Sequence, residues 1–246
     1  MESSSELRIL YEKNEKDVFR NLALEEAILL SLNEGNSSNT FRLWLNDSSA
    51  IAPFHESIFD LIDVEFCLDE GINIARRITG GGAIYNDCGN LNWSFFFNRK
   101  PFEKYSLKDL YSYFSSFIIK SLTQVGIDLN FHEPNWLGYE GKKVSGMAGY
   151  LKNNAILIHG TLLISADLTK LERVCKQHYK YPPVLNLSSI KPLDTEKVAN
   201  IILGSIEETF QSSFKIHFDT SPNEREEQLL SGLKEKYSSI AWVFEK

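Results

Sequence analysis

Hydrophobic residues recur along this chain with the spacing of helices in some segments. Residues 17–32 carry apolar side chains three and four positions apart, and Gly35 follows as a stop signal, which predicts a helix. Residues 107–125 show the same amphipathic spacing and are followed by Gly126. Similar patterns predict further helices at 59–71, near residue 167, at 195–214 and at 223–236.

Other segments have the composition and alternation of strands. Four of them are residues 7–11, 40–45, 72–78 and 91–97. Between residues 142 and 165, two β-rich runs are joined at Lys152-Asn153-Asn154, which predicts a hairpin turn. Because the strands cluster in the middle and the helices at the flanks, we expect an α+β fold with helices packed on a mixed β-sheet.

The chain is predicted to form one domain. We find no internal repeat and no linker, so residues 1–246 are expected to fold as a single domain. Pro182-Pro183 marks a loop, and the last seventy or so residues form a helical subregion without a boundary of their own. A chain of 246 residues buries about 70% of its unfolded surface, so it needs no disulfide or metal to fold.

Composition and charge exclude several classes of protein. The net charge of −7 argues against non-specific nucleic-acid binding, which depends on basic side chains that neutralise phosphates. Residues 1–6 lack the positive and apolar runs of a secretory leader, and no run reaches the roughly 18 apolar residues of a membrane span. The chain has three cysteines, an odd number, and they include no C-x-x-C pair. This argues against a disulfide framework or a cysteine-based zinc site formed by Cys67, Cys88 and Cys175. A cytoplasmic protein is expected.

The most unusual segment is Arg76-Arg77-Ile78-Thr79-Gly80-Gly81-Gly82, between two strand-like runs. One interpretation is a flexible turn. The other is a loop whose amides approach a phosphate or carboxylate where any Cβ would collide, with Arg77 supplying charge-assisted contacts. No Gly-Lys-Ser/Thr follows, and G-x-G-x-x-G does not match, so the segment is neither a Walker loop nor a dinucleotide fingerprint.

Two further segments contain residues with chemical potential. If the strand that begins at Lys142-Lys143 alternates, one lysine points inward, and an inward Lys143 would hold an anion as a compact point charge. Taken alone, a solvated lysine pair is the commoner outcome. His159 ends an apolar run, where a satisfied core or turn histidine is commoner than a catalyst. The other histidines, His55, His132 and His178, do not have the spacing of metal ligands. We therefore predict no metal site formed by the protein.

Together these segments resemble the catalytic domain of the lipoate-protein ligase A family, within the superfamily that also contains biotin-protein ligases and octanoyltransferases. The resemblance lies in residues 75–92, 142–146 and 159–168, in the family's order. Weaker similarity runs through residues 21–27 and 236–242, so nearly the whole chain is covered. The arginine followed by three glycines is the specific part of this resemblance.

The resemblance implies a two-step ligase. ATP and the lipoate carboxylate would first form lipoyl-AMP and pyrophosphate. The lipoyl group would then pass to a lysine of a lipoyl domain, in a 2-oxoacid dehydrogenase complex or the glycine-cleavage H protein. Mg²⁺ is expected to bridge the ATP phosphates. Neither a nucleic acid nor a membrane is expected as a partner.

The resemblance also implies roles for individual residues. Lys143 is expected to be catalytic and to touch both substrates, because it would hold the reacting groups at attack distance. The remaining ATP-binding residues are expected to be Arg77, Gly82, Ala83, Ile84 and Tyr85. The lipoate-binding residues are expected to be Gly80, Gly81, Lys143 and His159.

The chain departs from the family pattern at three places. Pro53-Phe54-His55-Glu56 stands where Gly-x-x-Gln is usual, Asn86-Asp87 replaces His-Asp, and Asn135-Trp136 replaces Asn-Asp. These positions are expected to line or support the pocket, so a changed acyl substrate or lost activity stays open. The usual C-terminal accessory domain is not recognisable, and we expect it to be dispensable or supplied by a separate chain.

Two alternative functions stay open. An octanoyltransferase that works without ATP needs a cysteine nucleophile. One branch of the superfamily has this cysteine three residues before the His-Gly, where this chain has Ile156. Another has it just before the lysine segment, where residues 133–136 contain no thiol, and Cys88 and Cys175 fall at neither place. The other alternative is a non-catalytic paralogue that binds a lipoyl domain.

Overall fold

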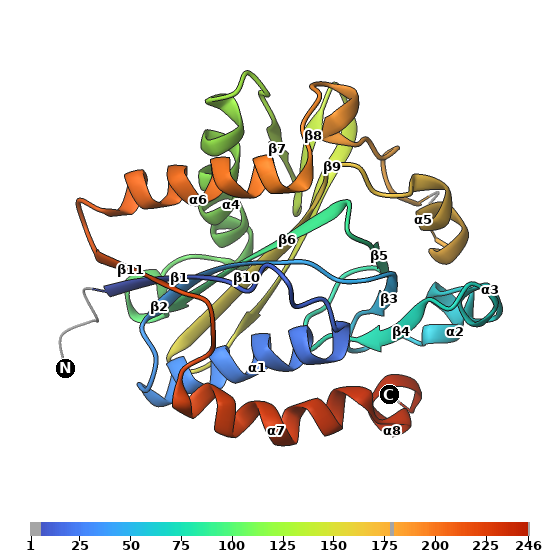
Figure 1. The fold of residues 1–246 in the computed structure, drawn as a ribbon, viewed down its shortest axis with the longest axis horizontal. Helices are drawn as coiled ribbons and strands as arrows, with labels where there is room; N and C mark the ends of the chain where they lie inside the picture. The colour runs from blue at the N-terminus through green and yellow to red at the C-terminus, as the bar shows by residue number, and fades with distance from the viewer. Residues whose placement is uncertain (1–5, 178–179, 246) are drawn as a thin grey trace.

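An eight-stranded mixed sheet forms the centre of the computed structural model, which describes residues 6–177 and 180–245 (Figure 1). The prediction that residues 1–6 are not a secretory leader concerns a segment of which residues 1–5 lie outside the described residues. His178 lies outside them too. The strand order is β11-β1-β2-β6-β10-β9-β8-β7. Its strands are β1 (Glu6–Tyr11), β2 (Asn39–Trp44), β6 (Asn90–Asn98), β7 (Asn130–His132), β8 (Trp136–Tyr139), β9 (Lys142–Leu151), β10 (Ala155–Leu163) and β11 (Lys215–Asp219).

A second sheet and eight α-helices complete the described fold. The smaller sheet has three strands in the order β4-β3-β5, which are β3 (Ser49–Ala52), β4 (Asn73–Arg76) and β5 (Ile84–Asn86). The helices are α1 (Val18–Glu34), α2 (Ile58–Leu61), α3 (Val64–Asp69), α4 (Leu107–Thr123), α5 (Leu168–Val174), α6 (Thr195–Phe210), α7 (Glu224–Ser238) and α8 (Ile240–Phe244), with short 3₁₀ turns at Lys100–Phe102 and Leu187–Ser189.

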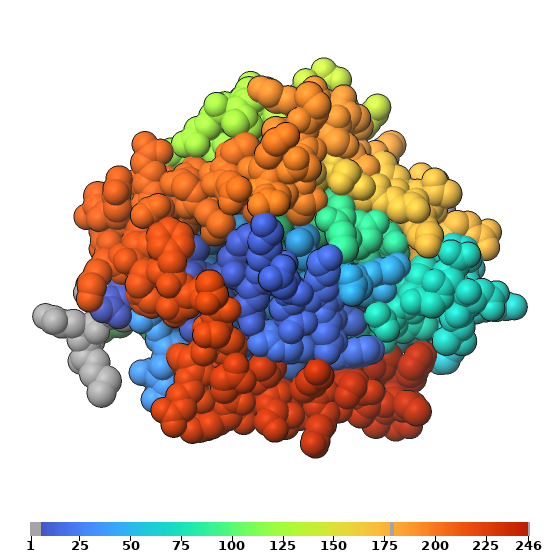
Figure 2. Space-filling model, viewed as in Figure 1, coloured from blue at the N-terminus to red at the C-terminus, as the bar shows by residue number. Residues whose placement is uncertain are grey.

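The helices cover the large sheet from both sides. Helices α4 and α6 lie above it in Figure 1, and α1 and α7 lie below it. In the space-filling view, α6 (orange) and α7 (red) flank the blue N-terminal residues (Figure 2). Each face has its own apolar core, one around Phe95 and Phe114 and the other around Leu24 and Phe96. The predicted α+β class with helices packed on a mixed sheet is therefore confirmed.

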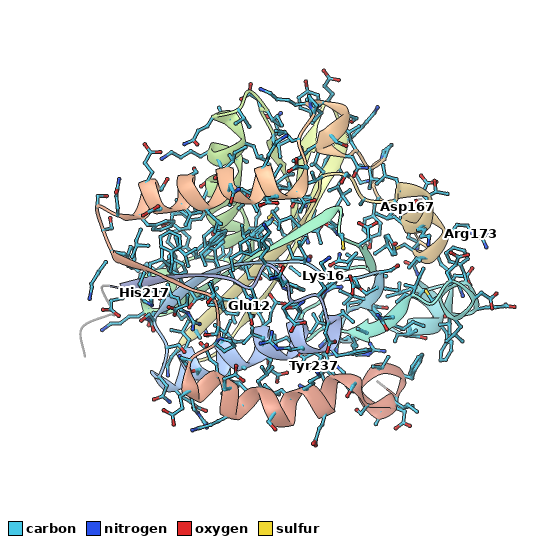
Figure 3. The ribbon with its side chains drawn as sticks, in the orientation of Figure 1. Glu12, Lys16, Asp167, Arg173, His217 and Tyr237 are labelled. Carbon is cyan, nitrogen blue, oxygen red and sulfur yellow. The ribbon has the colours of Figure 1, made fainter. Side chains whose placement is uncertain are left out.

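Buried polar contacts attach α7 to the rest of the fold. The Glu226 carboxylate, which has no solvent exposure, accepts hydrogen bonds from Arg8 of β1 at 2.6 and 2.8 Å. Tyr237 points from α7 toward α1 (Figure 3), where its hydroxyl donates to Glu26 at 2.8 Å. The C-terminal region is thus tied to the first strand and the first helix.

Two predictions for the secondary structure are wrong in detail. The single helix expected at 59–71 is two short helices, because Ile62 pairs with Cys175 as an isolated bridge and breaks the helical path. The Asp63 side chain then accepts from the Phe66 amide and starts α3. The region expected to be helical near the C-terminus also contains β11, which pairs in parallel with β1.

Within residues 6–177 and 180–245, no helix combines the length and apolar character needed to cross a membrane.

Candidate active site

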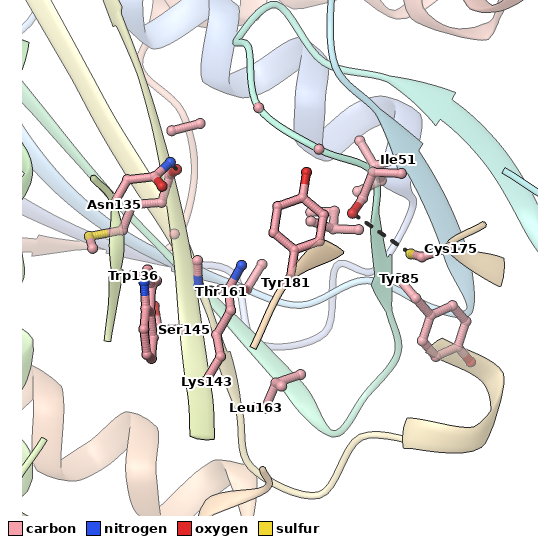
Figure 4. A pocket seen from close by; sticks show the side chains of 18 of the residues that line it. Ile51, Tyr85, Asn135, Trp136, Lys143, Ser145, Thr161, Leu163, Cys175 and Tyr181 are labelled. Atoms are coloured by element: carbon pink, nitrogen blue, oxygen red, sulfur yellow. Dashed lines mark hydrogen bonds between the residues drawn. The ribbon is translucent and has the colours of Figure 1, made fainter. Parts of the chain in front are cut away.

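A cavity of about 470 Å³ opens where residues of the large and small sheets meet (Figure 4). Three cationic side chains line it, those of Arg77, Lys143 and Lys180. Among the lining residues that the structure describes there is no aspartate and no glutamate. In a protein with a net charge of −7, this cavity therefore concentrates positive charge and favours an anionic ligand.

The floor of the cavity is a row of residues that crosses five neighbouring strands, which we call the floor row. Trp44 pairs with Asn92 and Asn92 with Thr161. The Gly146 amide donates to the Thr161 hydroxyl at 3.4 Å, and Gly146 pairs with Trp136 on the next strand. All five residues line the cavity, so an indole stands at each end of the row and a glycine lies between them.

Arg77 fixes the conformation of the glycine segment through hydrogen bonds to its main chain. Its guanidinium is buried and donates to the carbonyls of Gly80 at 2.6 Å, Gly82 at 2.8 Å and Ile51 at 3.3 Å, while Nε donates to Thr79 at 3.0 Å. Four of its five N–H groups are thus occupied by the chain itself. Burial lowers the pKa of Arg77 to about 10, yet the side chain stays charged at neutral pH. Arg77 therefore acts on the loop first, with one N–H left for a ligand.

We predict that Gly81→Ala destabilises the protein and Gly80→Ala does not. Gly81 has φ +100°, and a Cβ there would lie 3.1 Å from Arg77 Nη2. Gly80 lacks the positive φ and has open space around its Cβ position. Urea denaturation should show a loss of about 1–3 kcal/mol for Gly81→Ala only. Equal losses in the two variants would contradict this account of the loop.

His159 belongs to a chain of buried hydrogen bonds behind the loop. Its Nε2 lies 2.9 Å from the Thr79 hydroxyl, and its Nδ1 lies 3.0 Å from both carboxylate oxygens of Glu25. Burial acts to raise the pKa of Glu25, but the charge and hydrogen bond of His159, with a hydrogen bond from Ser94, hold it below its ordinary value. The histidine is fully engaged with protein groups, and it reaches Arg77 through Thr79.

Glu25 is a site residue that sequence reasoning missed. It lies in α1 on the side that also carries Leu22 and Leu29, and it is only 2% exposed. A carboxylate at a buried helical position needs a partner, and this was the available signal. The partner, His159, is 134 residues away, so the pattern of α1 alone could not identify it.

Lys143 projects into the cavity, whereas its neighbour Lys142 is exposed. Its Nζ lies 5.0 Å from the centre of the Tyr181 ring, and no carboxylate pairs with it in the described part of the chain. Lys143 and Tyr181 lie near each other in Figure 4. A Cβ at Gly146 would lie 2.9 Å from Nζ, so the glycine makes room for the ammonium. Burial lowers the pKa of Lys143, a shift that Cys175 opposes and Arg77 increases. A half-buried cation without a counter-charge is a ready anion site.

The structure gathers most of the predicted site residues around this one cavity. Eight line it, namely Arg77, Gly81, Gly82, Ala83, Ile84, Tyr85, Lys143 and His159. Gly80 does not line it, and its carbonyl accepts a hydrogen bond from Arg77. Their assignment to individual substrates stays a prediction.

The departures from the family pattern fall mostly outside the cavity. Only Trp136 is among its lining residues. Asn86 is buried and accepts a hydrogen bond from Asn46 at 3.0 Å. The Pro53 and Glu56 carbonyls accept from Arg76, and the Glu56 side chain is exposed. Trp136 therefore lines the pocket, whereas Asn86 lies behind the lining and donates to the Tyr85 carbonyl at 3.1 Å. That the departures outside the lining support the pocket stays a prediction.

Cys175 is a lining residue that no spacing rule anticipated. Its thiol donates to the Ala83 carbonyl across 3.7 Å, the dashed line in Figure 4. Burial, reinforced by the nearby Cys67, raises the pKa of Cys175 to about 12. The sulfur is therefore a protonated thiol near neutral pH and a weak nucleophile.

No metal cluster accompanies the cavity. Residues 6–177 and 180–245 contain no group of three or more histidine, cysteine, aspartate or glutamate side chains that could hold a metal ion. The described lining offers no carboxylate oxygen to Mg²⁺.

Comparison with known proteins gives a consistent result over most of the chain. The model of the lipoyl protein ligase A/B catalytic domain matches residues 17–207. Lipoate-protein ligase A subunit 1 of Thermoplasma acidophilum is 27% identical over 242 residues, which cover 90% of each chain. The chain spans about half the length of the first curated relatives it matches, between 44% and 56% of each.

Solved structures agree with these matches. A protein from T. acidophilum with bound lipoic acid superposes with a TM-score of 0.86 at 26% identity, covering 98% of this chain and all of that one. A bi-partite lipoate protein ligase with its E2 lipoyl domain, from the same organism, gives 0.85 at 27% identity, covering 97% and 96%. A lipoate-protein ligase A bound with ATP gives 0.83 at 26% identity, covering 97% and 98%.

Proposed function

The chain belongs to the lipoyl protein ligase A/B catalytic-domain family, and from this premise we propose that it is an ATP-dependent lipoate-protein ligase. The observation that carries the proposal is the acid-free cavity, in which the unpaired Lys143 faces the glycine segment held by Arg77. Both substrates of the first step, a carboxylate and a triphosphate, are anions. The ATP and the lipoic acid bound to the two similar structures support this choice of ligands.

In the first step, a lipoate carboxylate oxygen attacks the α-phosphorus of ATP. A C–O–P linkage forms and the bond to pyrophosphate breaks, giving lipoyl-AMP. The two anions repel each other, and the Lys143 ammonium neutralises the negative charge where they meet. The backbone of residues 82–85, which lines the cavity, supplies further polar contacts without a side-chain barrier at Gly82. Arg77 serves by fixing the loop.

The apolar tail of the acyl group fits the end of the cavity beside α1. This end is lined by Leu22, Trp44 and Ile51, all buried. The Trp44 ring is held from behind, because its Nε1 donates to Ser94 at 3.0 Å and the Arg42 guanidinium lies 5.1 Å from its centre. Burial of an eight-carbon chain there releases water from apolar surface and orients the carboxylate toward Lys143.

In the second step, the amine of an acceptor lysine attacks the acyl carbonyl. An amide bond forms, AMP leaves with the electrons of the C–O bond, and the nitrogen loses a proton to solvent. Mg²⁺ is expected to arrive on the ATP phosphates as part of the substrate, since the described lining offers it no carboxylate. The roles proposed above, namely charge neutralisation, positioning of the loop and binding of the acyl chain, are therefore assigned to residues of this chain and not to the metal ion.

The expected protein partner is a lipoyl domain of a 2-oxoacid dehydrogenase complex or the H protein. The E2 lipoyl domain studied with the T. acidophilum ligase supports the first. A separate accessory chain is also proposed, because the similar T. acidophilum protein is named subunit 1 and the ligase is called bi-partite. The present chain would then be one catalytic domain of the complete enzyme.

The octanoyltransferase alternative gains one observation, namely Cys175 on the cavity wall. Transfer would require this sulfur as a thiolate, and a pKa raised to about 12 disfavours it. Cys175→Ser should therefore keep most of the lipoylation activity. Loss of octanoyl transfer from acyl carrier protein in that variant, in the absence of ATP, would favour the alternative.

The decisive experiment measures pyrophosphate release from ATP with and without lipoate, with and without a candidate accessory chain. We expect lipoate-dependent release, followed by a mass increase of one lipoyl group on an added lipoyl domain. Release only with the second chain would identify a split ligase. Folded protein that releases no pyrophosphate under any of these conditions would refute the ligase proposal.

A further inference from the structure

Trp136 and His132 form a stacked pair at the outer end of the floor row. Their ring centres are 3.9 Å apart and their planes differ by 10°. The two residues are direct cross-strand partners on β8 and β7, so their side chains lie on the same face of the sheet. Gly138 makes the arrangement possible, because a Cβ there would lie 2.5 Å from the indole and 3.1 Å from the imidazole. The indole is thus held in place before any ligand binds.

The other neighbour of Trp136 across the sheet leaves the space beside the indole open. That neighbour is Gly146, which has no side chain. With His132 against one ring face, the second face of Trp136 looks over Gly146, next to the place where the Lys143 ammonium lies. Trp136 and Lys143 stand side by side in Figure 4. A flat apolar surface therefore adjoins the proposed anion site.

The order of groups along the floor row matches the order of groups in an acyl-adenylate. Trp44 and Trp136 are four strand positions apart, roughly 19 Å at about 4.8 Å per strand. The apolar end lies at Trp44. The Lys143 ammonium lies by Gly146, three strands from Trp44 and one from Trp136, which ends the row. An acyl-adenylate likewise has an acyl chain, a phosphate and a base, in that sequence.

We propose that the Trp136–His132 pair is a stacking platform for the nucleotide base, and that this chain recognises the base by its aromatic face. The inference rests on the proposed ligase function. The side-chain amide of Asn135, which precedes Trp136, donates to the Met147 carbonyl, and its main-chain carbonyl accepts from the Met147 amide, so these two groups are not available to a base. Stacking on an aromatic side chain tolerates any base. Guanine should therefore be accepted nearly as well as adenine.

The test is calorimetric binding of ATP, GTP and inorganic tripolyphosphate to wild type, Trp136→Leu and Trp136→Phe. Tripolyphosphate has no base, so its affinity reports on the cationic site alone. We expect ATP and GTP to bind wild type within about threefold of each other and Trp136→Leu about tenfold more weakly. Tripolyphosphate should bind both equally, and Trp136→Phe should stay within about threefold of wild type. Tyr150→Leu, on an exposed part of β9 outside the cavity, is the matched control.

Unchanged ATP affinity in folded Trp136→Leu would overturn the platform, as would a preference for ATP over GTP above about a hundredfold. An equal loss of tripolyphosphate binding would do so too, because it would show a general defect of the site. If Trp136→Leu does not fold, His132→Ser should weaken ATP at least about threefold and leave tripolyphosphate unchanged. A failed pyrophosphate assay would refute the ligase proposal. The calorimetric measurement would still decide whether the platform binds the base, because nucleotide binding needs no turnover.

Discussion

Lys143→Ala is expected to lower lipoate-dependent pyrophosphate release by about a hundredfold to a thousandfold. The ammonium has no carboxylate partner in the described structure, and in the proposed mechanism it lies where the carboxylate and the phosphate meet. Arg77 cannot replace it, since four of its five N–H groups hold the loop and Ile51. Lys142→Ala removes the same charge from the exposed neighbouring position, and it should retain nearly full activity. Similar rates for the two variants would mean that Lys143 lies outside the reaction.

The pH dependence provides an independent test of the same residue. Burial holds the pKa of Lys143 below the ordinary lysine value of 10.5, so the ammonium loses its proton at a lower pH than an exposed lysine would. Activity needs the charged form and should therefore decline on the alkaline side, beginning below pH 10.5. In Lys143→Arg, any activity that remains should extend to higher pH, because a guanidinium stays charged. An alkaline decline at the same pH in both proteins would assign it to another group.

Glu226→Ala is expected to cost about 3–5 kcal/mol in the free energy of unfolding, the largest stability effect we predict for a single side chain. The carboxylate has no solvent exposure and accepts hydrogen bonds from both Nη atoms of Arg8 and from the Ser37 hydroxyl. It also accepts from the Asn223 amide, which completes the capping box of α7. Its removal leaves the Arg8 guanidinium buried at 3% exposure without its counter-charge.

Urea denaturation followed by circular dichroism measures this loss. Glu224→Ala is the matched control, because Glu224 lies in the same first turn of α7 but is exposed. That variant should lose under about 1 kcal/mol. Arg8→Met combined with Glu226→Leu removes both charges and should recover much of the stability lost by Glu226→Ala. A loss below about 1 kcal/mol in Glu226→Ala would show that the pair contributes little.

Local patterns predicted the parts of the fold whose signals lie within one segment. The spacing of Leu22 and Leu29 placed α1, Gly126 marked the end of α4, and Asn153-Asn154 placed the turn between β9 and β10. The glycine segment and Lys143 were recognised by chemistry, and Gly81, Gly82 and Lys143 line one cavity. Each of these signals depends on a few neighbouring residues.

Features that depend on distant partners were not predictable from such patterns. Arg76 adjoins the residue predicted to contact an anion, yet it donates to the Pro53, Phe54 and Glu56 carbonyls and to the Val243 carbonyl of α8, none of which the segment itself indicates. The strand β11 is five residues long and half exposed, and its pairing with β1 gives it its place. A single sequence does not show which of its distant segments meet, because the patterns of the two segments are independent.

The position of β1 between β2 and β11 has a consequence for synthesis on the ribosome. β1 is the first described strand to emerge, and it pairs in parallel with β2 over residues 39–43. Its other edge stays open until residues 215–219 have left the exit tunnel, more than two hundred residues later. During that interval a row of unpaired N–H and C=O groups is available to other nascent chains. The edge that is exposed first is therefore covered only after most of the chain has been made, and a chaperone that covers β1 early in translation should raise the yield.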